Sequence, residues 1–120
     1  MVNKQIFIDT YQYFDKAVIL EIIDIFIDEC PDRLTTLEQN ITEASFDKLR
    51  FNAHSLKGVV ANFSAPAAFE KVKQLEKTAS DLVDNNGAGY NQKELLSNLA
   101  IIKEMVFEMM DDLKQIKAEY

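Results

Sequence analysis

The chain has 120 residues, enough for one domain with a buried core, and its 48% of apolar residues is ordinary for a globular protein. The net charge of -7 argues against nucleic acid and anionic membranes as partners, because both attract basic surfaces. Cys30 is the single cysteine and cannot form an internal disulfide, and no apolar run approaches the roughly 20 residues of a membrane span. We expect one domain over residues 1–120, located in the cytoplasm and starting at Met1 as a free-standing protein.

The N-terminal part of the chain predicts a short helix and then a long one. A short apolar segment runs from Ile6 to Phe14. After it, apolar residues recur every three or four positions, which is typical of an amphipathic helix. They are Ile19, Ile22, Ile23, Phe26, Cys30, Leu34, Leu37 and Ile41. Pro31 lies within this stripe and is expected to kink the helix or split it in two, since proline lacks an N–H and clashes with the preceding turn.

Three further stripes follow with short connections. They comprise Leu49, Ala53, Leu56, Val60 and Phe63; then Phe69, Val72, Leu75, Ala79 and Leu82 or Val83; then Leu95, Leu99, Ile102, Val106, Met109, Leu113 and Ile116. Ser45 can cap a helix that begins at Phe46, and Ser64 can cap the next one, with Pro66 in its first turn. Long amphipathic helices with short joins predict an all-α fold, an antiparallel four-helix bundle with a short additional N-terminal helix.

The loop "DNNGAGYNQ" before the last stripe resembles a calcium-binding EF-hand loop only superficially. With Asp84 at its first position, the fifth position is Ala88, which has no ligand oxygen, and the twelfth is Leu95, where a glutamate is required. One histidine and one cysteine cannot make a zinc site. No nucleotide-binding motif or nucleophile elbow is present. We therefore expect that the protein has no metal site and is not an enzyme.

The segment "AHSLKGVVANF", residues 53–63, contains the only histidine of the chain, His54. Lys57 and Gly58 follow it by three and four positions and share its helical face, beside the stripe of core residues. A glycine in an exposed helix costs about 0.8 to 1 kcal/mol relative to alanine, so a compensating use is expected. Without a side chain at Gly58, the imidazole stays open to a large partner.

The charge around His54 is the reverse of that of the whole chain. Residues 46–62 carry three bases and one acid, or +2, which leaves -9 for the rest. A basic region centred on a histidine suits a transient phosphoryl group. The alternative remains open, because a single histidine on a helix is more often a surface residue without a function.

These features resemble a histidine-containing phosphotransfer (HPt) domain, the phosphoryl carrier of bacterial and fungal phosphorelays. His54, Lys57 and Gly58 fit the family pattern H-x-x-K-G, and Asn62-Phe63-Ser64-Ala65 follows where the family has a Gly-Ala-like reversal. Ser64 departs from the glycine that is common there. The upstream segment "IFIDECPDRLTTLEQNI" is similar to the second helix of the family, so the resemblance covers essentially the whole chain.

The resemblance implies a mechanism and a set of partners. His54 would take a phosphoryl group from an aspartyl phosphate of a receiver domain on its distal ring nitrogen and pass it to a second receiver. Lys57 would neutralise part of the charge on the transferred group. Mg²⁺ would belong to the receiver, so this chain would need no cofactor. The expected partners are response-regulator receiver domains and a hybrid sensor kinase, and the chain would act as a monomeric, stoichiometric carrier.

Two further parts of the site are expected. A reversal near Ser64 should place residues 73–76 opposite His54, where Lys73, Gln74 and Glu76 are the polar candidates for fixing its ring; the resemblance favours Glu76. The segment "AVILEIIDIFI" is apolar almost all round, which is more than one packed face requires. It predicts an apolar docking patch beside His54. Phe51 and Phe14 are the expected docking residues.

Two other functions stay open at this point. The chain could be a non-catalytic helical-bundle interaction module in which His54 is incidental. It could also be a fragment of a histidine kinase, although no nucleotide-binding motif supports this. Labelling by a phosphorylated receiver without ATP separates the three functions, because only a carrier takes the label in that way.

Overall fold

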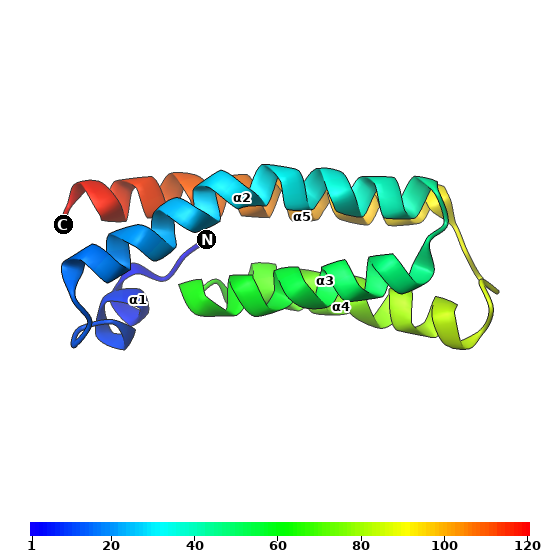
Figure 1. Cartoon of the computed structure of the whole chain (residues 1–120), viewed down its shortest axis with the longest axis horizontal. Helices are drawn as coiled ribbons and strands as arrows, with labels where there is room; N and C mark the ends of the chain where they lie inside the picture. Colours follow the sequence, from blue (N-terminus) through cyan, green and yellow to red (C-terminus); the bar gives the residue numbers. More distant parts are fainter.

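The structure is a computed structural model that describes all 120 residues, with five α-helices, one 3₁₀ turn and no β-strand. The helices are α1 (Lys4–Thr10), α2 (Lys16–Thr42), α3 (Phe46–Val60), α4 (Pro66–Asp84) and α5 (Gln92–Ala118), with the 3₁₀ turn η1 (Ala61–Phe63) between α3 and α4. Figure 1 shows the four long helices side by side in alternating directions, with α1 at one end. The predicted antiparallel four-helix bundle with a short N-terminal helix is confirmed. None of the helices has both the length and the apolar character needed to cross a membrane.

The core follows the apolar stripes of the sequence. Every long helix contributes its predicted stripe to one cluster of 27 buried residues, although Ile22 and Phe69 are only partly buried. α1 closes one end of the cluster with Phe7, whose ring lies 6.1 Å from that of Phe63. Phe63 in turn lies 4.6 Å from the ring of Phe26 on α2. Aromatic packing therefore fixes the end of the bundle at which α3 turns into α4.

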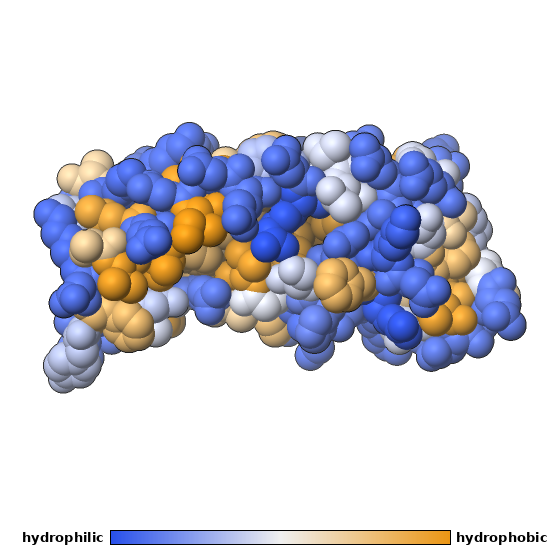
Figure 2. Space-filling model, in the orientation of Figure 1, coloured by the Kyte–Doolittle hydropathy of each residue, from blue (hydrophilic) through white to orange (hydrophobic).

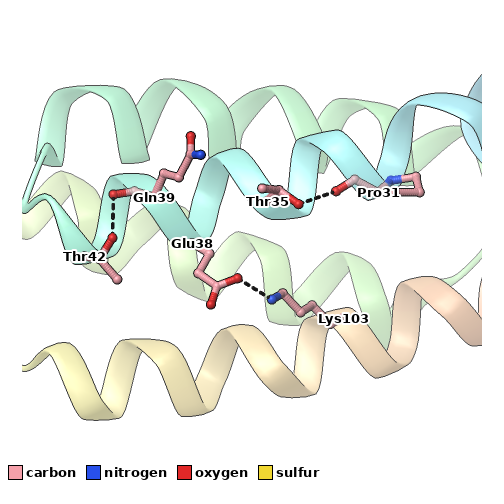
Figure 3. Close-up of polar contacts among 6 residues, drawn as sticks. All are labelled: Pro31, Thr35, Glu38, Gln39, Thr42 and Lys103. Atoms are coloured by element: carbon pink, nitrogen blue, oxygen red, sulfur yellow. Dashed lines mark hydrogen bonds and ion pairs between the residues drawn. The ribbon is translucent and has the colours of Figure 1, made fainter.

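Of the two effects expected of Pro31, the split does not occur. α2 is unbroken from Lys16 to Thr42, and Figure 1 shows it changing direction near its middle, as a proline kink does. Pro31 is exposed, whereas Cys30 and Leu34 beside it are buried, so packing on both sides holds the helix together. The Thr35 hydroxyl donates a hydrogen bond of 3.1 Å to the Pro31 carbonyl (Figure 3).

The helix caps differ in part from the prediction. Ser45 occupies the capping position of α3 as expected, but its side chain makes no capping hydrogen bond. The prediction that Ser64 caps α4 is wrong, because Ala65 holds that position and Pro66 is the first helical residue. Ser64 instead adopts a left-handed conformation with φ of +55°, directly after η1. This conformation ends helices and favours glycine, which accounts for the glycine expected here from the resemblance.

Polar contacts fix α5 and the loop before it against α2. Lys103 of α5 forms an ion pair of 2.8 Å with Glu38 of α2 (Figure 3). The C-terminal end of α2 is held by Tyr90, whose hydroxyl donates a hydrogen bond to the Ile41 carbonyl. Tyr90 also packs edge-on against the ring of Phe46, at the start of α3. The loop between α4 and α5 is thus tied to the joint between α2 and α3.

This contact predicts that Tyr90→Phe lowers the free energy of unfolding by about 1 kcal/mol, the usual net contribution of one hydrogen bond. The ring and its packing are retained, so only the hydroxyl is tested. Urea unfolding followed by circular dichroism measures the change. The control is Tyr13→Phe, because Tyr13 is 92% exposed and makes no hydrogen bond through its hydroxyl. Equal stability of the two variants would show that the Tyr90 hydroxyl contributes nothing.

Candidate functional site

The exposed face of α3 carries His54 on a line of accessible residues. The buried positions of α3 are Leu49, Ala53, Leu56 and Val60. The solvent-facing side of α3 presents Phe51, His54 and Gly58, which are all exposed, and the side chain of His54 is 69% accessible. The imidazole therefore stands beside the core stripe and faces solvent, where the periodicity of the sequence places it.

Glu76 on α4 contacts the ring of His54. Its Oε1 lies 2.7 Å from His54 Nδ1. Lys73 and Gln74, the other two candidates, are exposed and make no hydrogen bond with the ring. Because α3 and α4 are antiparallel and joined by the short η1 turn, residues 22 positions apart meet across the two helices. The sequence argument from the position of the reversal thus points to the right segment of α4.

Lys57 shares this carboxylate with His54. Its Nζ lies 2.6 Å from Glu76 Oε2, and the two side chains are 25% and 20% exposed. Oε2 is buried and has no other partner, so the ion pair with Lys57 is the only interaction that compensates for its loss of contact with water. Sequence reasoning placed the ammonium beside the ring but did not foresee that a carboxylate holds it there. Glu76 therefore bridges the histidine and the lysine.

The charge state of Glu76 follows from these contacts. Partial burial raises the pKa of its carboxyl, but the hydrogen-bonded side chains of Lys57 and His54 lower that pKa by more. The resulting pKa lies below the ordinary value, so the group is a carboxylate at neutral pH. A carboxylate only accepts hydrogen bonds, so His54 Nδ1 must carry a proton and donate it.

The other ring nitrogen is left available for chemistry. In the neutral imidazole, a proton on Nδ1 leaves the lone pair on Nε2. Nε2 has no hydrogen-bond partner within the protein. A nitrogen lone pair on an exposed face is a nucleophile that a large substrate can reach.

Gly58 leaves open space next to the ring. A Cβ atom added at this position would meet no other atom within 4 Å, and the backbone is ordinary helix. Gly58 is therefore not a packing glycine at a helix contact. Its surface is open on the same side as His54, which it follows by one turn.

An apolar groove of about 260 Å³ lies between α2 and the end of α3. It is lined by Ile22, Ile25, Phe26, Cys30, Val59 and Phe63, with Glu29, Arg33 and Asn62 at its polar edges. Figure 2 shows apolar surface gathered over the N-terminal half of α2 on this face. Phe51 and Phe14 are 72% and 53% exposed, but neither lines the groove. The apolar run in α2 indicates an exposed apolar surface, but the sequence pattern does not show that Ile25 and Val59 line a groove.

Arg33 lies between this groove and the helix of His54. It donates a hydrogen bond of 2.8 Å to the Ser55 hydroxyl, next to His54 in the chain, and pairs with Glu29 at 3.4 Å. Sequence reasoning missed this residue, because periodicity along one helix does not show which side chains of another helix reach it. The structure contains no cluster of three or more His, Cys, Asp or Glu side chains that could hold a metal. Burial raises the pKa of Cys30 to about 12, so it remains a thiol.

A comparison with known families adds to what the fold and the geometry of the site show. A family model described as the Hpt domain matches residues 21–119. The chain belongs to the Hpt domain family. Hpt domains are phosphocarrier modules of phosphorelays rather than kinases, and they interact with receiver domains of two-component systems. Neither the curated proteins nor the solved structures compared with the chain include a match.

The open surface at Gly58 predicts opposite effects on stability and transfer. Gly58→Ala should stabilise the protein by up to about 1 kcal/mol, since alanine favours helix and meets no atom there. Gly58→Gln should melt no lower than the wild type. Its side chain would stand beside the imidazole, and a displacement near 1 Å can slow transfer about a hundredfold. Melting curves and a time course of labelling by a phosphorylated receiver measure both effects.

The control for Gly58→Gln is Ala100→Gln, at an exposed position of α5. It introduces the same side chain into a helix away from His54 and should leave labelling unchanged. Rapid labelling of a stable Gly58→Gln variant would show that access through this surface does not limit transfer.

Proposed function

We propose that this protein carries phosphoryl groups between receiver domains by forming a phosphohistidine at Nε2 of His54. The observation that supports this most directly is the pairing of His54 Nδ1 with Glu76, because it directs the Nε2 lone pair to an open surface. Membership of the Hpt family supports phosphotransfer as the activity. Residues 1–120 would form a single such domain.

The transfer needs no nucleotide. The Nε2 lone pair attacks the phosphorus of an aspartyl phosphate, and the P–O bond to the aspartate breaks with its electron pair returning to that carboxylate. In the next step an aspartate of a second receiver attacks the same phosphorus, and the electron pair of the P–N bond returns to Nε2. Each cycle regenerates the carrier, so it acts stoichiometrically and not as an enzyme.

Lys57 is proposed to stabilise the charge on the transferred group. Its ammonium is held by Glu76 one turn along α3 from His54, which places a cation at the edge of the site. Charge on the equatorial phosphoryl oxygens would be neutralised in part by this group. Mg²⁺, which supplies further neutralisation in such reactions, is proposed to be bound by the receiver alone.

The apolar groove is the proposed docking surface for a receiver. It is built partly from α3, so it runs on from the helix that carries His54. A helix of the receiver with an apolar face would fill it, and Phe51 and Phe14 would extend the contact. We propose response regulators and a hybrid sensor kinase as the sources of these receivers. The carrier itself is proposed to be a cytoplasmic monomer.

The groove also favours a second candidate function. An interaction module without phosphotransfer would bind a partner helix in the same groove and make no use of His54. A kinase fragment is less well supported, because Hpt domains are carriers and not kinases. Labelling at His54 by a phosphorylated receiver separates the carrier from the interaction module, because only the carrier takes up the phosphoryl group.

The first experiment tests His54 itself. Purified wild-type protein incubated with a phosphorylated receiver and no ATP should acquire an acid-labile label. His54→Gln should acquire none and should melt as the wild type does, because an exposed side chain contributes little to stability. Labelling of His54→Gln at the wild-type rate would remove His54 from this role. Absence of label in the wild type with every receiver that binds would favour the interaction module.

The second experiment tests the groove. Ile25→Asn should raise the KM for the phosphorylated receiver about tenfold, since burying one isoleucine contributes about 1.5 to 3 kcal/mol. Ile101→Asn on α5 is the matched control, because the two isoleucines are 45% and 40% exposed and only Ile25 lines the groove. Labelling by potassium phosphoramidate, a small donor that needs no docking, should be equal in both variants. Equal KM values for the receiver would place docking elsewhere.

A further inference from the structure

The residue that orients His54 is a carboxylate with both oxygens engaged. Oε1 meets Nδ1 of His54 and Oε2 meets Nζ of Lys57. An amide at this position would also accept a hydrogen bond from Nδ1–H through its oxygen. Its NH₂ group would then face the ammonium of Lys57, and two donors repel each other. The arrangement therefore uses the negative charge of Glu76 as well as its ability to accept a hydrogen bond.

We propose that Glu76 keeps Nδ1 of His54 protonated after phosphorylation and thereby sets the upper pH limit at which the phosphoryl group leaves readily. This inference deepens the proposed function and rests on phosphorylation at Nε2. Glu76 is a positioning residue here, since it acts through the ring and not on phosphorus.

The chemistry of the P–N bond explains why this proton matters. When the bond breaks, its electron pair returns to Nε2 and the phosphorus forms a bond to the oxygen of an aspartate or of water. With Nδ1 protonated, the leaving group is neutral imidazole. Without that proton the leaving group is imidazolate, a far stronger base and a poorer leaving group. A carboxylate hydrogen-bonded to Nδ1–H favours the protonated ring and hence the labile form.

The same charge assists the arrival of the phosphoryl group. Attack by Nε2 turns a neutral ring into a positively charged one, because Nδ1 retains its proton. The carboxylate at 2.7 Å compensates this charge as it develops. Glu76 therefore lowers the barrier in both directions, as a carrier between two receivers requires.

The other charges near the ring act in the opposite sense. On α3 they are Lys57 and Arg50, and on α4 Lys73 lies one turn before Glu76. Arg50 pairs with Asp47 at 3.6 Å, which offsets part of its effect. On α2, Arg33 reaches α3 through its hydrogen bond to Ser55 and is paired with Glu29. Cations disfavour a protonated ring, and Glu76 is the only acidic side chain in contact with it. Loss of its charge should therefore make the proton on Nδ1 of the phosphorylated ring easier to lose.

The test compares the pH dependence of phosphate release. Wild type, Glu76→Gln and the control Glu70→Gln are phosphorylated with potassium phosphoramidate, freed of the donor, and followed for release of inorganic phosphate from mildly acid to alkaline pH. Glu70 is an exposed acid on the same helix, six residues away, and forms no ion pair or side-chain hydrogen bond. Glu70→Gln should follow the wild type.

For Glu76→Gln the midpoint of the profile should fall by about one pH unit, a value at the low end for a nearby opposite charge because the ring is largely exposed. Above both midpoints the variant should release phosphate about tenfold more slowly, and at acid pH the two rates should converge. Glu76→Asp, which keeps the carboxylate, should restore part of the shift. ¹⁵N NMR of the phosphorylated ring should show Nδ1 losing its proton at lower pH in Glu76→Gln.

Three results would overturn the inference. Coincident profiles for wild type and Glu76→Gln would show that the charge has no effect. Uniform slowing at every pH would show that Glu76 only orients the ring. If Glu76→Gln unfolds, Glu76→Asp is the variant that decides. A wild-type release profile in Glu76→Asp, with NMR showing that Nδ1 has lost its contact with the carboxylate, would also overturn the inference. Because phosphoramidate needs no receiver, a failure of receiver labelling would count against the proposed function alone.

Discussion

The antiparallel contact between α3 and α4 is the constraint on which the site depends. Its register is set by the reversal from η1 to Pro66, where Ser64 takes a left-handed conformation and Phe63 is buried against Phe26. A shift of one residue along α4 would turn the side chain of residue 76 by about 100°, since a helix has 3.6 residues per turn. Glu76 would then miss both His54 and Lys57. The turn between α3 and α4 thus determines both the packing at this end of the bundle and the contacts of Glu76 with His54 and Lys57.

The distribution of charge around the site reduces the repulsion between an acidic protein and an anionic phosphoryl group. A net charge of -7 would repel a phosphoryl group if it were evenly spread. The helix that carries His54 instead has an excess of basic residues, and Lys57 is tied down beside the ring. Glu76 adds a negative charge, but it lies on the side of Nδ1 and is already compensated by Lys57. The phosphoryl group would approach from the opposite, exposed side of the ring.

Most of the fold could be predicted from the sequence because helical periodicity is a local property. The buried residues of α3 and α5 are those of the stripes, with Met110 as the one addition, and α3 begins at Phe46 as expected. Position relative to the reversal was enough to bring the segment of Glu76 opposite His54. The ion pair of Lys57 was not predictable in this way, because it depends on rotamers across two helices. Ser64 was misassigned because cap preference is weaker than the demand of the turn for a left-handed residue.

The groove was harder to predict for a different reason. An apolar run in one helix shows that more than one face is apolar, but not which neighbour leaves a gap beside it. The groove lies where the N-terminal part of α2 passes the end of α3, with Val59 of α3 and Phe63 of η1 among its lining residues. Both parts of α2 pack into the core of the bundle, Ile19 and Ile23 before Pro31 and Leu34 and Leu37 after it. Only the part before Pro31 adds apolar side chains to the groove, namely Ile22, Ile25, Phe26 and Cys30. Since α3 forms both the wall of the groove and the backbone of His54, a partner seated in the groove is held at a fixed distance from the nucleophile. If the proposed docking and in-line attack occur here, they would require no movement of the carrier, and the precision of transfer would rest on the rigidity of α3.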